Sequence, residues 1–406
     1  MQSCLELIPD DAQRVFVAFS GGLDSTVLLH LLCADPRNFN IIAWHFNHGL
    51  LDAASDMEKF CIEQAERAGL EIRVDQLRLD KVESNVEAVA RHNRYALFSR
   101  HTRAGDCILT AHHADDQAET FLLNALRGSG SAGLRGIARQ RLLDGGALLL
   151  RPLLDYSRSL LESYARQHKL TWVDDPSNRS SKFDRNYLRN QVVPLLKKRW
   201  PQFESSFATA SQLQSETQDV LDEIAALDFL QVKSTASKGI ATLDITQLEL
   251  LSPGRRKNLL RYWITRAGLA VIPYARMQEL MHQIHAKADA VPEIAMPDYS
   301  IRIYDQRLFL VVKEKLRERS GSFDFGLQTN VEIKKFDLQV ERSEIFRELG
   351  ITDQNQALSL RFRDDGQQND DRHRLKRMFQ KHRVPPWERA AIAQVYLDGK
   401  LQGLLL

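Results

Sequence analysis

A short loop rich in serine and glycine follows the first apolar run of the chain. Residues 15–19 (VFVAF) are typical of a buried strand, and residues 20–25 (SGGLDS) lead into the apolar pattern of a helix. Glycines let the backbone approach a phosphate, and the free amides of a helix N-terminus favour negative charge. We therefore expect this loop to bind a nucleotide through Ser20, Gly21, Gly22, Leu23, Asp24 and Ser25. An ordinary strand-to-helix turn, with Asp24 as the helix cap, is the alternative.

A second group of polar residues, 111–120 (AHHADDQAET), comes after another apolar run. Its imidazoles and carboxylates are His112, His113, Asp115, Asp116 and Glu119. Zinc binding is one interpretation, but the spacing differs from HExxH, and adjacent histidines in a strand point in opposite directions. Carboxylates suit a hard cation that accompanies phosphates, so we favour a site for ATP, Mg²⁺ and substrate over zinc. That Asp115 or Asp116 acts only as a helix N-cap remains open.

The sequence has two pairs of arginines whose two members are about one helical turn apart. Arg91 and Arg94 fall in the middle of one expected helix, where they could clamp phosphates or face solvent. Arg185 and Arg189 fall on one face of another, where they could receive an RNA backbone or pyrophosphate. Residues 128–133 formally match GxGxxG, but they follow a helix and not a strand. This context excludes a dinucleotide fingerprint and predicts a flexible loop.

Alternating strands and helices must position these groups. Apolar runs predict strands at residues 15–19, 41–46, 72–79, 107–110 and 147–150, with helical patterns between them. The alternation predicts an α/β nucleotide-binding domain, in which helices cover both faces of a parallel sheet. Ligands of such sheets bind at the carboxyl ends of strands, near a change in strand order. The 20–25 loop and residues 111–120 both lie at strand ends of this kind.

The composition is that of a globular protein with two or three domains. The chain has 406 residues, of which 43% are hydrophobic and 27% charged, and its net charge is only +2. Because the sequence shows neither a signal pattern nor an apolar stretch of bilayer length, we expect a cytoplasmic protein with no membrane partner. The four cysteines form no CxxC pair and no zinc spacing, and Cys33 and Cys107 are expected to be core thiols.

The second half of the chain carries the local basic clusters. We expect residues 1–201 to form the nucleotide-binding domain, 202–238 a helical connector, and 239–320 and 321–406 two smaller α+β domains. Basic residues cluster at 197–199, 255–257 and 372–383. Each cluster taken alone is more often a solvated helix face than a binding site.

Several motifs together resemble one enzyme family. In chain order these are SGGLDS, NHGL, ARHNRY, AHHADDQAET with LRGSG, RPLL, DDPSN and RNYLRNQVVP. The sequence is similar to the tRNA(Ile)-lysidine synthetases, which belong to the PP-loop superfamily of N-type ATP pyrophosphatases. The resemblance is dense over residues 15–194 and looser over 376–387. Related tRNA thiolases require CxxC cysteines, and none occur here.

This resemblance implies a reaction. L-lysine would be ligated to C2 of cytidine 34 in the CAU anticodon of tRNA(Ile) through an adenylated cytidine, with ATP converted to AMP and pyrophosphate. Decoding would change from AUG to AUA, and tRNA identity from methionine to isoleucine. The partners implied are tRNA(Ile) and L-lysine, and a homodimer is left open.

The resemblance also implies roles for individual residues. Catalytic work would fall to Asp24, His112, His113, Asp115, Asp116 and Glu119, with Mg²⁺ near Asp24. Substrate contacts would come from Arg94, Arg127, Arg185, Asn186 and Arg189. In one stretch the chain departs from the family, because residues 364–371 are acidic where a glycine-rich basic loop is usual. The alternatives are another adenylating enzyme of the same superfamily and a tRNA-binding protein whose ATP site no longer turns over.

Overall fold

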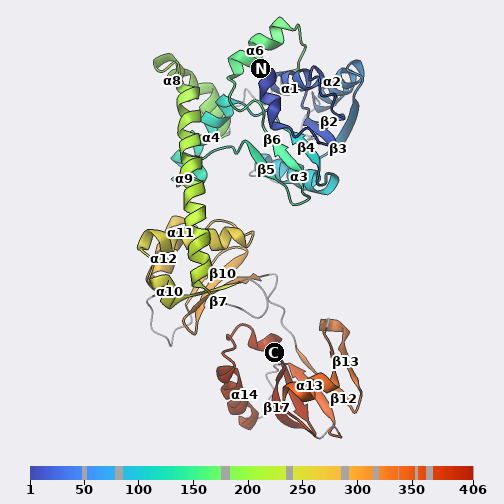
Figure 1. Cartoon of the computed structure of the whole chain (residues 1–406), viewed down its shortest axis with the longest axis vertical. Helices are drawn as coiled ribbons and strands as arrows, with labels where there is room; N and C mark the ends of the chain where they lie inside the picture. Colours follow the sequence, from blue (N-terminus) through green and yellow to red (C-terminus); the bar gives the residue numbers. More distant parts are fainter. Residues whose placement is uncertain are drawn as a thin grey trace. The chain divides into compact units, whose positions relative to one another are not determined.

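The computed structural model describes residues 1–47, 53–77, 86–174, 183–234, 241–284, 292–313, 320–336, 338–352, 355–362 and 369–405. The chain forms two compact units, Met1–Val220 and Leu221–Leu406, which follow the colour bar from blue to red in Figure 1. The four domain limits expected from the sequence remain a proposal.

A six-stranded sheet forms the centre of the first unit. Its strands lie in the order β3-β2-β1-β4-β6-β5, and all neighbours are parallel except β5 and β6. In β1, Val15 pairs with Ile41 on one side and with Cys107 on the other. The strands are β1 (Arg14–Ala18), β2 (Ile41–Asn47), β3 (Glu71–Gln76), β4 (Asp106–Leu109), β5 (Gln140–Leu142) and β6 (Leu148–Leu150). The expected α/β fold with a parallel sheet is confirmed.

Helices cover both faces of this sheet. Val17 and Leu28 belong to one buried cluster, to which α1, α2 and α6 contribute. Phe16 and Phe98 belong to a second cluster, under α3 on the opposite face. The alternation of side chains along β1 explains why adjacent residues enter different clusters. The helices of the first unit are α1 (Leu23–Cys33), α2 (Ala53–Arg67), α3 (Val86–His101), α4 (Ala114–Leu126), α5 (Ser131–Leu134), α6 (Arg158–Gln167), α7 (Asp184–Tyr187) and α8 (Val193–Arg199), with the 3₁₀ helix η1 (Gln2–Leu7) and the π turn η3 (Leu188–Val192).

The order of the strands changes direction beside β1. The chain runs outward from β1 through β2 to β3 and then returns to the other side of β1 as β4. The helices that follow β1 and β4 therefore diverge at this point, and their N-terminal ends leave room for a ligand between them. Those ends carry the 20–25 loop and residues 111–119.

The second unit contains two main sheets. The long helix α9 (Phe203–Val232) runs from the first unit into the second. One sheet has the order β7-β8-β11-β10-β9, and the other has the order β12-β15-β16-β17, beside the hairpin β13-β14. The strands are β7 (Lys233–Ser234), β8 (Thr242–Asp244), β9 (Glu293–Ala295), β10 (Tyr299–Tyr304), β11 (Arg307–Val312), β12 (Gly321–Gly326), β13 (Asn330–Ile333), β14 (Leu338–Glu341), β15 (Leu358–Phe362), β16 (Ala393–Leu397) and β17 (Lys400–Leu405). The helices are α10 (Ile245–Glu249), α11 (Pro253–Arg266), α12 (Tyr274–Gln283), α13 (Arg342–Glu348) and α14 (Asn369–Lys381), with the 3₁₀ turns η5 (Lys334–Phe336) and η6 (Arg389–Ala391).

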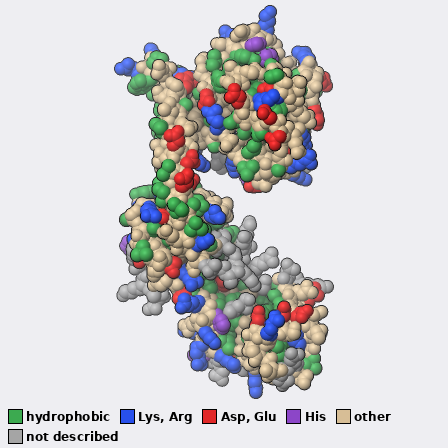
Figure 2. Space-filling model, viewed as in Figure 1, with side chains coloured by type: hydrophobic (Ala, Val, Ile, Leu, Met, Phe, Trp, Pro, Cys, Tyr) green, Lys and Arg blue, Asp and Glu red, His purple; other side chains and the backbone are tan. Residues whose placement is uncertain are grey.

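Helix α14 has a basic outer face. Its apolar residues Leu375 and Phe379 are buried, whereas its basic residues are exposed. Lys and Arg side chains gather over this helix in Figure 2. The exposed residues are Arg372, Arg374, Lys376, Arg377 and Lys381.

Two local expectations are wrong. Cys33 is exposed, because it is the last residue of α1 and faces away from the core, whereas Cys107 is buried as expected. Residues 128–133 are not simply a loop, because Gly130 caps the short helix α5.

No helix in the described part of the chain is long and apolar enough to cross a membrane. Residues 48–50 of NHGL, 175–178 of DDPSN and 364–368 of the acidic stretch lie outside the described residues.

Candidate active site

The 20–25 loop leaves the carboxyl end of β1 and begins α1. Gly21 has a φ of +77°, and a Cβ at this position would lie 3.0 Å from Cys61 Sγ, so the turn favours glycine. Gly22 is the N-cap of α1, and Asp24 lies in the first turn. The alternative in which Asp24 caps the helix is therefore wrong. The free backbone N–H groups at this N-terminus favour an anion.

The two serines hold the shape of the loop. Ser20 Oγ lies 3.1 Å from Ser25 Oγ, which donates a hydrogen bond to the carbonyl oxygen of Gly22 over 3.0 Å. The side chain of Leu23 packs in the hydrophobic core, so only its backbone N–H can contact a nucleotide. The structure thus brings the six expected nucleotide-binding residues into one closed turn.

Asp24 connects this loop to the second polar group. Its Oδ2 lies 3.6 Å from Nε2 of His113. Its Oδ1 is buried and has no hydrogen-bond partner among the described residues. A carboxylate oxygen without a partner, beside a turn expected to bind phosphate, fits a hard cation such as Mg²⁺, which takes few protein ligands and completes its shell with phosphate and water.

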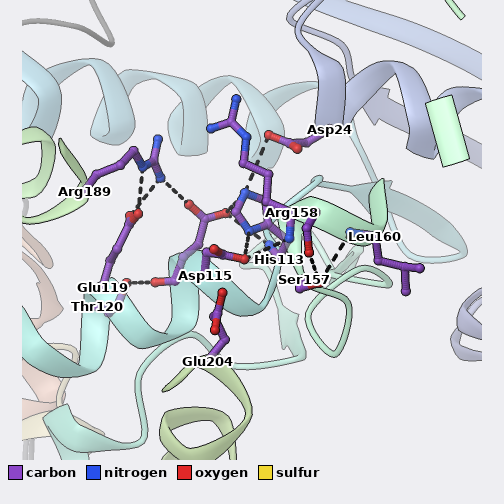
Figure 3. Close-up of polar contacts among 12 residues, drawn as sticks. Asp24, His113, Asp115, Glu119, Thr120, Ser157, Arg158, Leu160, Arg189 and Glu204 are labelled. Atoms are coloured by element: carbon purple, nitrogen blue, oxygen red, sulfur yellow. Dashed lines mark hydrogen bonds and ion pairs between the residues drawn. The ribbon is translucent and has the colours of Figure 1, made fainter. Parts of the chain in front are cut away.

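His113 is the N-cap of α4 and is 2% exposed. Its backbone N–H donates to Asp116 Oδ2 over 3.1 Å, so neither Asp115 nor Asp116 is the N-cap. Its Nδ1 lies 3.6 Å from Asp115 Oδ2, and its Nε2 lies 3.4 Å from Asp116 Oδ2. Burial by itself would lower the pKa of His113, but the surrounding carboxylates, Asp116 first, raise it to about 10. The side chain is therefore an imidazolium at neutral pH, and Figure 3 shows it among these carboxylates.

Asp115 is anchored by two elements that follow α4. The backbone N–H of Arg158, at the start of α6, donates to Asp115 Oδ2 over 2.8 Å. On α8, Lys197 Nζ lies 2.5 Å from Asp115 Oδ1 and also contacts Glu204. Burial opposes ionisation of Asp115, but His113, this N–H group and Lys197 together lower its pKa below the usual range. Asp115 therefore ties α4, α6 and α8 together.

Two arginines form ion pairs with the other two carboxylates of α4, Asp116 and Glu119. Arg189 lies on the π turn η3, and its Nε and Nη2 each lie 2.7 Å from an oxygen of Glu119 (Figure 3). Arg185 Nε lies 3.1 Å from Glu119 Oε2, and Arg185 Nη2 lies 3.0 Å from Asp116 Oδ1. Burial opposes ionisation of Asp116, but the charges of His113 and Arg185 outweigh it and lower its pKa. The arginine pair expected to meet phosphate or RNA is thus already held by carboxylates.

His112 differs sharply from its neighbour. Its Nδ1 lies 3.0 Å from Thr110 Oγ1. Desolvation lowers its pKa to about 3; Asp116 acts against this shift, and Arg151 adds to it. His112 is therefore neutral at physiological pH and a weak base, whereas His113 is held as a cation.

Three of the expected substrate residues lie outside this cluster. Arg94 stacks over the ring of Phe46, 5.8 Å from its centroid, on the face that α3 covers. Arg127 follows α4 at the surface and lies 3.6 Å from Asp184. Asn186 lies on α7 between the two arginines.

Two positioning groups, the Lys197 side chain and the Arg158 backbone N–H, were not predicted from the sequence. Lys197 was part of a basic cluster that predicts a solvated face, and the signal that it lies inward is its place in the amphipathic pattern of α8. The contribution of Arg158 comes from its backbone, which residue type does not encode.

The assembled side chains can support nucleotidyl transfer. The 20–25 loop offers amides and a helix N-terminus, and α4 brings an imidazolium and three ionisable carboxylates next to it. Cations and amides that are fixed in advance stabilise charge that develops on phosphate oxygens. Glu119 is already paired with two guanidinium groups, so it can bind an ammonium group only if it releases one of them.

Three family models match the chain. A model described as PP-loop domain matches residues 1–196, one described as TilS substrate binding domain matches 243–309, and one described as TilS substrate C-terminal domain matches 355–402.

Named relatives match most of the chain. The tRNA(Ile)-lysidine synthase of Serratia proteamaculans is 36% identical over 403 residues, which is 96% of this chain and 90% of that protein. The enzyme of the same name from Legionella pneumophila is 32% identical over 96% of this chain and 90% of its own length. Among solved structures, the U34-tRNA thiolase NcsA from Methanococcus maripaludis is similar with a TM-score of 0.44 and 18% identity, over 53% of this chain and 77% of that chain.

Proposed function

Because this chain belongs to the tRNA(Ile)-lysidine synthase family, we propose that it joins L-lysine to C2 of cytidine 34 of a tRNA(Ile) with a CAU anticodon, at the cost of one ATP. The observation that carries the proposal is the 3.6 Å contact between Asp24 Oδ2 and His113 Nε2. This contact brings the 20–25 loop and the carboxylate-rich helix α4 together, which supports a single site that uses both.

The first step is adenylation of the base. The C2 carbonyl oxygen of the cytidine attacks the α-phosphorus of ATP, the bond from that phosphorus to the bridging oxygen breaks, and pyrophosphate leaves. The amides of Gly21 and Gly22, with the N-terminus of α1, hold the phosphates. The imidazolium of His113 neutralises charge that develops between the phosphates and the base. Arg185 and Arg189 lie beside the same groups and can turn towards phosphate.

Mg²⁺ fits this site through the unpartnered Oδ1 of Asp24. When bound, it would withdraw charge from the phosphate oxygens. Asp24 would thus bind Mg²⁺ through Oδ1 and contact His113 through Oδ2.

The second step transfers lysine. The ε-amino nitrogen attacks C2, the C2–O bond breaks, and AMP leaves with that oxygen. The ammonium must first lose a proton, and we assign its acceptance to the carboxylate of Glu119, which lies beside Asp116 and the two arginines. His112 is a weak base at this site, because burial lowers its pKa to about 3. Asp116 and Glu119 orient the incoming ammonium as they release a guanidinium.

The second unit supplies binding surface for tRNA. The two substrate-domain matches lie in it, and the exposed basic face of α14 suits a phosphate backbone. Both ATP and tRNA are cytoplasmic substrates, so we place the activity in the cytoplasm. The reaction scheme does not require a homodimer. Sedimentation of the purified protein would show whether it is a monomer or a dimer.

Turnover of labelled substrates tests the function. Purified protein is incubated with α-labelled ATP, labelled lysine and tRNA(Ile), and a methionine tRNA with the same CAU anticodon is the control. We expect AMP release and lysine incorporation into the isoleucine tRNA only. AMP without lysine transfer would mean an adenylating enzyme with another substrate, and no AMP with any tRNA would reduce the chain to a binding protein.

A further inference from the structure

Three arginines converge on one tyrosine at the edge of the sheet near His112. Arg91 and Tyr95 belong to α3, Arg141 lies in β5, and Arg151 follows β6 directly. Tyr95 Oη accepts hydrogen bonds from Arg151 Nη2 over 2.9 Å and from Arg91 Nη2 over 3.2 Å. The guanidinium carbons of Arg91 and Arg141 lie 5.2 and 5.4 Å from the centre of the Tyr95 ring. We call these four residues the Tyr95 cluster.

The innermost member of the Tyr95 cluster is a buried cation. Arg151 is 3% exposed, and its Nη1 donates to the carbonyl oxygen of Ala138. Its Nε has no hydrogen-bond partner among the described residues. A buried guanidinium whose partners are neutral has lost its hydration without gaining a counter-ion, which is unfavourable unless an anion completes the site.

The outer members add to this imbalance. Among the carboxylate side chains that the structure describes, a set that leaves out residues 78–88, none lies in ion-pair distance of Arg91, Arg141 or Arg151. Arg185 and Arg189 of the active site, by contrast, are each paired with Asp116 and Glu119. Among the described side chains, the Tyr95 cluster is therefore a concentration of positive charge without a carboxylate partner, and it is open to solvent through exposed Arg91 and Arg141.

The position of the Tyr95 cluster separates it from the nucleotide loop. The 20–25 loop begins α1, which packs on one face of the sheet, whereas Tyr95 packs with the buried cluster under α3 on the other face. In the strand order, β4 stands between β1 and β6. Two strand spacings are about 10 Å, so a phosphate at the Tyr95 cluster is distinct from those held by the loop. The cluster nevertheless lies beside the active site, because Leu109 of β4 pairs with Leu150 of β6 and the N–H of Thr110 donates to the carbonyl oxygen of Leu150 over 3.0 Å. Arg151 and His112 thus leave neighbouring strands at the same end.

We propose that Arg91, Arg141, Arg151 and Tyr95 bind a backbone phosphate of the RNA adjacent to the nucleotide that is modified. This inference rests on the proposed function, because it assumes that an RNA base enters beside His112. Arg151 supplies the fixed buried charge, Tyr95 orients it, and Arg91 and Arg141 close over the phosphate from the rim. The RNA would gain affinity and register here without any reading of base identity.

The test uses the two rim arginines, whose loss leaves the buried members in place. The variant R91A/R141A is compared with the wild type and with R100A. Arg100 is an exposed arginine of the same helix, nine residues from Arg91 and therefore about 180° around it. Binding of tRNA(Ile) is measured by filter binding over a range of KCl concentrations. ATP binding is measured separately by equilibrium dialysis, and melting temperatures check that all three proteins are folded.

We expect R91A/R141A to bind tRNA about tenfold or more weakly at 0.15 M salt, with a salt slope shallower by about 1 to 2 in log–log units. ATP affinity and the R100A variant should be unchanged, and KM for tRNA should rise more than kcat falls. An unchanged tRNA affinity and salt slope would overturn the proposal. Loss of ATP affinity with intact tRNA binding would assign the cluster to the nucleotide instead.

These outcomes are separable from failure of the proposed function. If the wild type binds tRNA but forms no lysidine, the function fails while the salt slopes still decide the role of the rim arginines. If R91A/R141A melts early, single variants R91A and R141A, each expected to lower the slope by about 1, replace it.

Discussion

The Oδ2 atom of Asp24 lies 3.6 Å from the Nε2 atom of His113, and this contact joins the 20–25 loop to the N-terminus of α4. Each residue begins a helix that follows a central strand, and each comes from a different sequence motif. The protonation state of His113 therefore sets part of the charge at the N-terminus of α1, where we propose that the phosphates of ATP bind.

Removal of the imidazolium is the first prediction. We expect His113→Gln to lower the rate of AMP formation about a hundredfold, because a fixed cation beside the phosphates is lost. Its effect on stability depends on pH. The pKa of His113 is raised from 6.5 to about 10, so its stabilisation is complete below pH 6.5 and is lost as the pH rises towards 10. The difference in unfolding free energy between wild type and variant should shrink by up to about 1.4 kcal/mol per pH unit in that window. A difference that is constant from pH 6 to 10 would contradict the assignment.

The second prediction concerns the cation at Asp24. We expect Asp24→Asn to raise the Mg²⁺ concentration needed for half-maximal pyrophosphate release about tenfold, because the unpartnered Oδ1 becomes part of a neutral amide. The exposed Asp144→Asn is the control. Mg²⁺ titrations at saturating ATP make the comparison, and identical titrations for both variants would remove Asp24 from the cation site.

The third prediction separates two causes of glycine preference. Gly21→Ala and Gly69→Ala both place a side chain at positive φ, which costs about 1–2 kcal/mol. Only at Gly21 does the new Cβ meet a neighbour, Cys61 Sγ at 3.0 Å, while none lies within 4 Å at Gly69. We expect both variants to melt earlier but only Gly21→Ala to lose ATP affinity, by about tenfold. Equilibrium dialysis with labelled ATP decides it, and equal affinities would mean that the loop tolerates the shift.

The fourth prediction compares adjacent lysines. Lys197→Met removes the cation that holds Asp115 and Glu204, whereas Lys198→Met changes an exposed side chain. Because Lys197 is partly exposed, solvent screens its pairs, and we expect a loss of about 1–2 kcal/mol together with reduced activity. Lys198→Met should change stability by less than about 0.5 kcal/mol. Urea unfolding and the lysine incorporation assay provide both readouts, and equal behaviour of the two variants would show that Asp115 does not depend on α8.

The fifth prediction is a double-mutant cycle across α4 and η3. Arg189→Met leaves the buried carboxylate of Glu119 with less compensation, and Glu119→Gln does the converse, so each should cost about 3 kcal/mol. The double variant should cost at least about 1 kcal/mol less than the sum, because it leaves no isolated charge. The exposed pair Arg166 and Glu162 is the control, with a coupling of about 0.5 kcal/mol or less. Additive values at Arg189 and Glu119 would mean that the two side chains do not interact.

Local pattern was sufficient to locate the two motifs but not to assign charge states. The glycine loop and residues 111–119 lie where the sequence predicts, because strand and helix patterns are local and the carboxyl ends of parallel strands share one edge. His112 and His113 are identical and adjacent in sequence, yet the pKa of one falls to about 3 and that of the other rises to about 10. The difference comes from desolvation and from partners on other elements, which spacing does not reveal.

Long-range pairing explains one further departure, and the end of a helix explains another. Arg185 and Arg189 were expected to meet substrate, but carboxylates some 70 residues earlier in the chain hold them. Cys33 sits in an apolar run, yet the helix ends there and turns the thiol outward. For the arginines, the packing of distant segments decided what each side chain faces, whereas for Cys33 the end of the helix decided it.

The π turn at Leu188–Val192 sets the direction in which the side chains of the following helix α8 point. Arg189 lies on this turn and grips Glu119, while Lys197 lies beyond it and grips Asp115. One residue of an α-helix corresponds to about 100° of rotation, so deleting a single residue from the turn would swing Lys197 away from α4 and leave Arg185 where it is. The π turn therefore sets the register in which one continuous stretch of chain pairs with both Glu119 and Asp115.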